Sequence, residues 1–203
     1  MPTPLRAVAL VCTLKSAQVA SSSELLATQV LDELATHGVE GESIRVIDHA
    51  VAFGVETDMG SGDGWPEIRE KVLEADIVIL ATPIWMGHAA SISQQVLERL
   101  DAELSETDDR GRPVLFDKVA LVAVVGNEDG AHKASADILQ GLSDVGFTLP
   151  AQGVTYWTGE AMHTIDYQDL ASTPEKVAST TATAARNAAH LATLLSEKEY
   201  PAS

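Results

Sequence analysis

Runs of aliphatic and β-branched residues mark the candidate strands of this chain. Residues 5–12, 76–81 and 118–125 are almost continuously apolar, a pattern typical of strands buried on both faces of a parallel sheet. Residues 43–47 alternate between apolar and polar positions and predict a weaker strand, and residues 151–156 predict a fifth.

The intervals between these strands carry apolar residues at helical spacing. Leucines and valines recur every three or four residues over 25–34, after three serines that can cap a helix and before His37-Gly38 as a stop. Other helical patterns begin at Trp65, Ser91, Ala131 and Pro174. This strict alternation predicts an α/β fold of three layers, a doubly wound five-stranded parallel sheet with helices on both faces.

In doubly wound sheets, ligands bind outside the carboxyl ends of the strands, where the strand order reverses. The loops that follow the first, third and fourth strands are residues 13–23, 82–90 and 126–133. We therefore expect a binding site to be built from these three loops.

Composition and charge narrow the class of protein. The 203 residues are 45% hydrophobic, with 30 acidic and 13 basic residues and a net charge of −17. The apolar content argues against a disordered acidic protein, and we expect one domain over residues 1–203. The net charge argues against non-specific binding to nucleic acid or anionic membranes. Since we find neither a signal-peptide pattern nor an apolar run of about 20 residues, we expect a cytoplasmic protein.

The first loop is rich in hydroxyl groups and precedes a helix. Hydroxyls beside the free N–H groups of a helix start can bind an anion. Serines also cap helices very often, and composition alone slightly favours that reading. Acidic residues gather at 40–63 and 101–109, away from the loop in sequence. The candidate anion-binding residues are Thr13, Lys15, Ser21, Ser22 and Ser23.

The second loop places bulky apolar residues beyond a strand end. A flat aromatic ligand would explain them, and a subunit contact or local packing would explain them equally well. The third loop combines conformationally flexible glycines with short polar side chains. It can either bring backbone amides close to a ligand or form a tight turn into the next helix. The candidates in these loops are Pro83, Ile84, Trp85, Met86, Gly87, Asn127, Glu128, Asp129 and Gly130.

A few further residues have two interpretations each. The single cysteine, Cys12, rules out a disulfide framework within the chain, and we interpret it as a core residue rather than a reactive thiol. His88 and His132 are interpreted as surface residues, and no metal-ligand spacing is present. The loop at 156–163 is equally consistent with a cover over a ligand and a cover over the sheet edge.

Three segments together resemble one family. They are CTLKSAQVASSSELL at 12–26, TPIWMGHAASISQQVLERLD at 82–101 and VVGNEDGAHKA at 124–134. In order and spacing they are similar to the phosphate-binding and flavin-contacting segments of the NAD(P)H-dependent FMN reductases, which have a flavodoxin-like fold. The resemblance implies a strand order of 2-1-3-4-5, bound FMN, NADPH or NADH as electron donor, and homodimers or homotetramers. It places the phosphate on the first loop and the isoalloxazine ring between the other two.

The resemblance implies an oxidoreductase that passes electrons from a reduced nicotinamide through bound flavin to a small acceptor, such as a flavin or quinone. Backbone amides of 85–87 and 127–130 would then stabilise negative charge on the reduced flavin. The alternative is a flavodoxin-type electron carrier without its own nicotinamide oxidation, which the acidity favours somewhat. A binding module without FMN is a third possibility.

Overall fold

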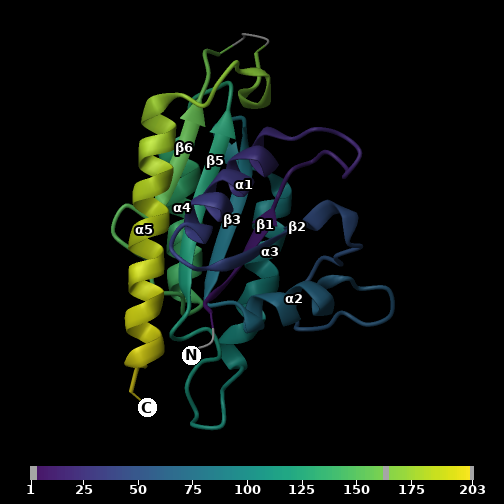
Figure 1. Ribbon diagram of the computed structural model, residues 1–203. Coiled ribbons are helices and arrows are strands. Elements are labelled where there is room, and N and C mark those ends of the chain that lie inside the picture. The colour runs from purple at the N-terminus through teal and green to yellow at the C-terminus, as the bar shows by residue number, and fades with distance from the viewer. Residues whose placement is uncertain (1–3, 162–164, 202–203) are drawn as a thin grey trace.

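Five parallel strands form the central sheet, in the order β2-β1-β3-β5-β6 (Figure 1). This is the predicted order 2-1-3-4-5 when the parallel strands alone are counted, and it is confirmed. The computed structural model describes residues 4–161 and 165–201. The strands are β1 (Arg6–Val11), β2 (Glu40–Arg45), β3 (Ile77–Trp85), β4 (His88–Ala89), β5 (Val119–Gly126) and β6 (Val154–Thr158). The α-helices are α1 (Ser22–Ala35), α2 (Trp65–Glu74), α3 (Ser91–Asp101), α4 (Ala131–Asp144) and α5 (Glu175–Glu197).

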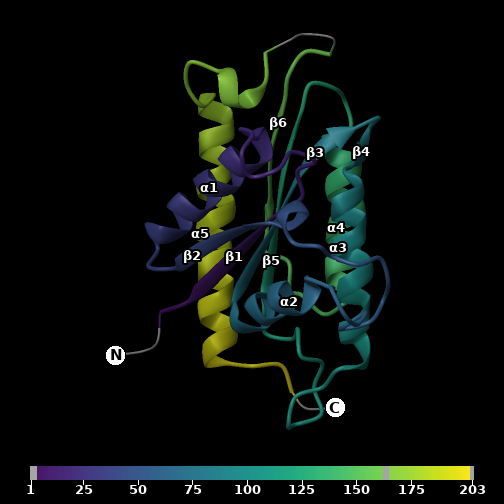
Figure 2. The ribbon, with the colours of Figure 1, turned by 90° about the vertical axis from the view of Figure 1, so that its right-hand side faces the viewer.

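Helices cover both faces of the sheet, as Figure 2 shows. Alternate residues of β1 point to opposite faces, so Ala9 packs in one core and Leu10 in the other. The first core includes α1 and α5, and the second includes α2, α3 and α4. The three layers therefore follow from continuously apolar strands that need a cover on each face.

Strand β3 is longer than the sequence predicts, because it continues through Thr82 and Pro83 to Trp85. The N–H of Cys12 donates to the carbonyl of Ala81 at 2.7 Å, and β1 then ends. Alternate residues of a strand direct their backbone groups to the same side, so Pro83 faces the side where β1 has ended. Its missing N–H breaks no ladder there.

The two edge strands also differ from their predicted bounds. Strand β2 begins at Glu40 and is largely exposed, so burial imposes no apolar pattern by which its start could be recognised. A 3₁₀ turn, η1 (Val46–Asp48), follows it where the strand was expected to continue. Strand β6 begins at Val154 and continues to Thr158, two residues beyond its predicted end.

The glycine- and aspartate-rich loop between β2 and α2 is fastened to α3 by a buried ion pair. Arg99 donates to Asp63 at 2.7 Å, and the two side chains are 0% and 1% exposed. Arg99 also donates to the carbonyls of Ala52 and Glu56 and lies over the ring of Trp65. A single buried guanidinium therefore organises most of this loop.

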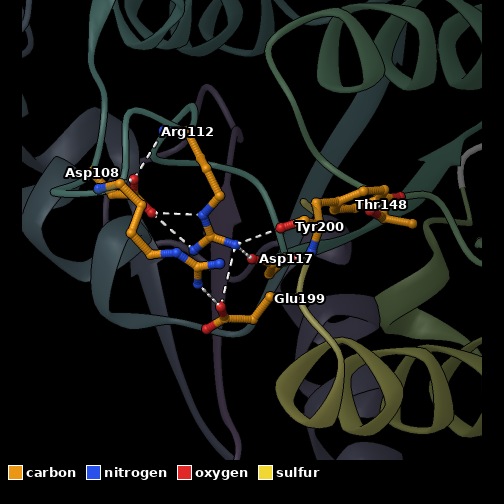
Figure 3. A network of polar contacts seen from close by, with 7 residues as sticks. Asp108, Arg112, Asp117, Thr148, Glu199 and Tyr200 are labelled. Carbon is orange, nitrogen blue, oxygen red and sulfur yellow. Dashed lines mark hydrogen bonds and ion pairs between the residues drawn. The ribbon is translucent and has the colours of Figure 1, made fainter. Parts of the chain in front are cut away.

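The chain after α5 packs at the amino ends of the strands, and the loops predicted to bind a ligand lie at the carboxyl ends. Figure 3 shows Arg112 between Asp108 and Asp117, with Glu199 and Tyr200 on the tail. Arg112 donates to the carbonyl of Tyr200 at 3.1 Å, and Asp117 accepts the N–H of Tyr200 at 2.7 Å.

Within residues 4–161 and 165–201, none of the helices combines the length and apolarity needed to cross a membrane. In the same part of the chain, no three His, Cys, Asp or Glu side chains are grouped closely enough to hold a metal ion.

Candidate functional site

A cavity of about 240 Å³ lies at the carboxyl ends of β1, β3, β5 and β6. All three predicted loops reach it, and the segment after β6 closes one side. Its lining consists of Thr13, Leu14, Lys15, Ser21, Ser22, Ser23, Pro83, Ile84, Trp85, Val125, Gly126, Asn127, Glu128, Trp157, Asp166 and Tyr167.

The hydroxyl-rich end of the cavity is formed by the start of α1. The Ser21 hydroxyl caps the helix by accepting the N–H of Glu24 at 3.4 Å, so the capping interpretation is confirmed for this serine. Ser22 and Ser23 occupy the first turn, where backbone N–H groups have no partner within the helix. Thr13 and Ser23 are buried residues of the cavity lining, and the Thr13 hydroxyl accepts the N–H of Lys15 at 3.2 Å. Capping and anion binding are compatible here, because a hydroxyl that accepts an N–H can still donate its own O–H to an anion.

Arg45, at the end of β2, supports the first loop from behind. Its guanidinium donates to the carbonyls of Lys15, Ser16 and Val19 and pairs with Glu24. Sequence reasoning missed this residue, because Arg45 lies 29 residues along the chain from Ser16. Its only local signal is a charged residue at the end of a strand.

Acidic side chains also reach the first loop from elsewhere in the chain. Asp48 accepts the N–H of Ala17 at 3.1 Å. Asp166 accepts from the Asn127 amide at 2.9 Å and lies 3.8 Å from the Lys15 ammonium. The expectation that acids lie away from this loop is therefore wrong, since sequence distance did not reflect distance in space. Trp157 belongs to the segment at 156–163 that the sequence predicts to cover either a ligand or the sheet edge, and it lines the cavity. Asp166 and Tyr167 are cavity residues for which the sequence offered no signal beyond their place after a strand.

The second loop forms a two-residue hairpin between β3 and β4. Met86 and Gly87 occupy its turn with φ of 54° and 75°. Glu128 accepts the N–H of Met86 at 2.9 Å and that of Gly87 at 3.2 Å. These two amides were expected to face a flavin. In the structure they donate hydrogen bonds to the Glu128 carboxylate of the third loop instead.

The structure brings ten of the fourteen predicted site residues into the cavity lining. Met86 and Gly87 lie at the hairpin tip instead, and Asp129 and Gly130 lie in the loop that packs against it. A side chain at Gly130 would approach the backbone of Gly87 to 2.7 Å, which explains the glycine there. These four residues therefore lie outside the cavity lining.

Cys12 and the two histidines lie outside this arrangement. Burial raises the pKa of the Cys12 thiol to about 12, and the side chain packs in the second core, which confirms the interpretation as a core residue. His88 is exposed in β4. His132 contacts the hydroxyl of Tyr156 at 3.1 Å, and neither histidine lines the cavity.

The comparisons with known proteins point to flavin proteins. A family described as NADPH-dependent FMN reductase matches residues 5–162. The chain is 32% identical over 166 residues to the 8-demethyl-8-aminoriboflavin-5′-phosphate synthase of Streptomyces davaonensis, covering 77% of this chain and 65% of that protein. It is 33% identical over 172 residues to a protein of Mycobacterium bovis named divalent metal cation transporter MntH, covering 83% of this chain.

The chain spans 25% of the length of the Mycobacterium bovis protein and 65% of that of the synthase. A crystal structure of RosB with bound 8-demethyl-8-formylriboflavin-5′-phosphate superimposes with a TM-score of 0.86 at 30% identity, covering 97% of this chain and 82% of RosB. Flavodoxins of known structure share the fold. The chain belongs to the NADPH-dependent FMN reductase family and has a flavodoxin-like fold.

Proposed function

We propose that this enzyme carries electrons from NADPH or NADH through FMN bound in the cavity to a small acceptor, such as free flavin or a quinone. The observation that carries the proposal is the cavity itself. It lies at the switch point of a doubly wound sheet, with hydroxyls and helix amides at one end and two tryptophans along its walls.

The chemistry of the hydroxyl-rich end fits a phosphate. Unpartnered N–H groups of the first turn of α1 and the positive end of its dipole favour an anion. Arg45 binds three carbonyls of the loop, so these oxygens face the guanidinium rather than a bound anion. We assign the phosphate to Thr13, Lys15, Ser21, Ser22 and Ser23.

The remaining walls fit a flat aromatic ring with polar edges. Pro83, Ile84 and Trp85 supply apolar surface. The side-chain amide oxygen Oδ1 of Asn127 is buried without a hydrogen-bond partner among the described residues, so a ligand N–H would satisfy it. We assign the ring to these residues and Glu128, with Met86, Gly87, Asp129 and Gly130 at its rim.

FMN, when bound, supplies the redox chemistry by accepting a hydride and later giving up two electrons. The chain's own residues would then bind and orient it, and we assign no side chain as acid or base. Because Glu128 already accepts from Met86 and Gly87, the N–H groups of 127–130 are the donors we propose for negative charge on the ring.

The exposed hairpin tip supports our proposal of a homodimer or homotetramer. Met86 is 88% exposed and Trp85 55% exposed beside the cavity. A second copy of the chain or the acceptor would cover this apolar surface. We also propose a cytoplasmic location.

A second candidate is an enzyme for which FMN is the substrate. The resemblance to the synthase and to RosB favours it, because the names of those proteins specify modified flavin phosphates. In that case the same cavity would hold FMN, and the flavin released from the protein would differ in mass from the flavin added.

The experiment compares oxidation of NADPH and NADH by FMN-loaded protein, with riboflavin or a quinone as acceptor, against free FMN alone. We expect turnover that needs the protein and returns FMN of unchanged mass. FMN retained without turnover with either nicotinamide would instead indicate an electron carrier, and a change in flavin mass would indicate the synthase-like candidate.

A further inference from the structure

Both basic side chains near the start of α1 already have acidic partners, but the two pairs are held very differently. The side chain of Arg45 is 6% exposed, and its guanidinium also binds three backbone carbonyls. Lys15 and Asp166 are 42% and 43% exposed, and their charged atoms are 3.8 Å apart. Such an exposed pair contributes little to stability. Lys15 is therefore free to exchange its partner, whereas Arg45 is fixed.

Asp166 is held at the same end of the cavity as the hydroxyl groups. Its Oδ1 accepts from the Asn127 amide, which fixes the carboxylate over the ends of the strands. Two residues later, the N–H of Gln168 donates to the Ser22 hydroxyl at 3.3 Å, so this segment rests on the first turn of α1. An anion bound at that turn would meet the Asp166 carboxylate.

The charges around the cavity make this carboxylate important. Among the described residues of the lining, the acidic and basic residues are Lys15, Glu128 and Asp166, so acids outnumber bases. Glu128 is directed to the hairpin amides, and Glu24 is paired with Arg45. Asp166 is thus the acid of the lining that faces the lysine assigned to the phosphate.

We propose that Asp166 competes with the FMN phosphate for Lys15 and so determines how strongly the site prefers FMN to riboflavin. The inference rests on the proposed placement of the phosphate at the start of α1. When the phosphate binds, Lys15 exchanges the carboxylate for it, and the remaining repulsion between the two anions limits the gain. Asp166 is a specificity residue, because riboflavin lacks the phosphate and does not engage in this exchange.

The test is the dissociation constant of FMN and of riboflavin, measured by quenching of flavin fluorescence, for the wild-type protein, Asp166→Asn and Asp169→Asn. Asp169 is an exposed acid three residues away that does not line the cavity. Its variant makes the same change in net charge as Asp166→Asn and leaves the cavity lining unchanged. We expect Asp166→Asn to bind FMN about fivefold more tightly and riboflavin with less than about a twofold change. Asp169→Asn should change neither constant by more than about twofold.

A second variant, Lys15→Gln, changes an exposed side chain and does not depend on how Asp166→Asn folds. It should weaken FMN binding about fivefold and leave riboflavin binding unchanged. If the wild-type protein binds FMN but the FMN-to-riboflavin ratio stays the same in both variants, the inference is wrong and the proposed function stands. If the wild-type protein binds neither flavin, the proposed site is wrong and the inference falls with it.

Discussion

Glu128 has the least expected role among the individual residues. It comes from the third loop, yet its carboxylate accepts both N–H groups of the hairpin turn. Positive φ is costly for a residue with a side chain, and Met86 adopts it at 54°. Two charge-assisted hydrogen bonds offset part of that strain. Glu128 therefore fixes where the hairpin places Trp85 relative to the cavity.

The substitution Glu128→Gln tests this role in the protein without flavin. Glutamine has one carbonyl oxygen in place of two carboxylate oxygens, so one turn amide loses its partner. We expect hydrogen exchange at Met86 and Gly87 to become about fivefold faster, since about 1 kcal/mol is lost locally. Amide exchange followed by NMR measures this.

Asp129→Asn is the control, because Asp129 is the adjacent acid, is exposed and would undergo the same change in charge. Equal exchange rates in Glu128→Gln and wild type would show that the two hydrogen bonds do not hold the turn.

Prediction from sequence succeeded where a residue's chemistry is local. The cap at Ser21 and the burial of Cys12 follow from their immediate neighbours. Arg45 and Asp166 reach the first loop across 26 residues or more, and neither lies in a local pattern that predicts this contact. Their roles depend on the order of strands in space, which only the folded chain displays.

The loop from residue 49 to 64 shows how one buried pair organises a whole segment. Burial alone would raise the pKa of Asp63, but hydrogen bonds from Arg99 and from the N–H groups of Met59, Ala52 and Trp65 outweigh it. The pKa of Asp63 is therefore held well below its ordinary value. Because the folded pKa lies below the unfolded one, the resulting stability is present above the unfolded pKa and is lost as the pH falls toward the folded one.

Asp63→Asn should lower the free energy of unfolding by about 3 kcal/mol at neutral pH, because Arg99 is left buried without a counter-charge. The difference from wild type should stay constant down to about pH 5 and shrink below about pH 4. Urea unfolding at several pH values measures both effects.

Asp58→Asn serves as the control in the same loop. Asp58 accepts the N–H of Gly60 at 2.7 Å, a bond that asparagine can keep. A loss as large as that of Asp63→Asn in this variant, or a loss in Asp63→Asn that does not shrink in acid, would contradict the account.

Element bounds were predictable to the extent that burial imposed a pattern. Strand β5 is buried from Val119 to Val125 and begins within one residue of its predicted start. The exposed edge strand β2 has no such pattern, and its start was missed. The end of β3 was missed for another reason, since Pro83 is a strand breaker only where a neighbouring strand needs its N–H.

The cavity and the contacts that hold the C-terminal tail lie at opposite ends of the molecule. The cavity lies at the carboxyl ends of the strands. The Arg112 network, drawn in Figure 3, binds the tail at the amino ends of the strands, near the C-terminus marked in Figure 1. Contacts that are distant and share no residues are expected to act independently.

Arg112→Gln should therefore loosen the tail without changing flavin binding. We expect residues 198–201 to be cleaved about tenfold faster by a carboxypeptidase, because Tyr200 loses its contact to the guanidinium. The dissociation constant of FMN should stay within about twofold of wild type.

Arg110→Gln is the matched control, since Arg110 is about half exposed and, among the tail residues up to 201, pairs with Glu199. It should have a smaller effect on cleavage. A marked change in FMN binding in Arg112→Gln would contradict the independence of the two ends.

The net charge of −17 was a poor guide to the site. Within the first loop the sequence places Lys15, hydroxyl groups and helix amides, and the structure adds Arg45 behind the loop and Asp166 beside it. Screening over about 8 Å makes these neighbours more important than the total charge. The family membership and the cavity together point to a protein that binds FMN despite its acidity.

The central claim is that this protein uses a reduced nicotinamide to reduce its own bound FMN. The most direct measurement mixes FMN-loaded protein with NADPH or NADH in the absence of oxygen and of any acceptor, and follows the visible absorption of oxidised flavin. We predict that the absorption is lost with at least one nicotinamide and returns when a quinone is added. Loss of the absorption with dithionite but with neither nicotinamide would contradict the claim.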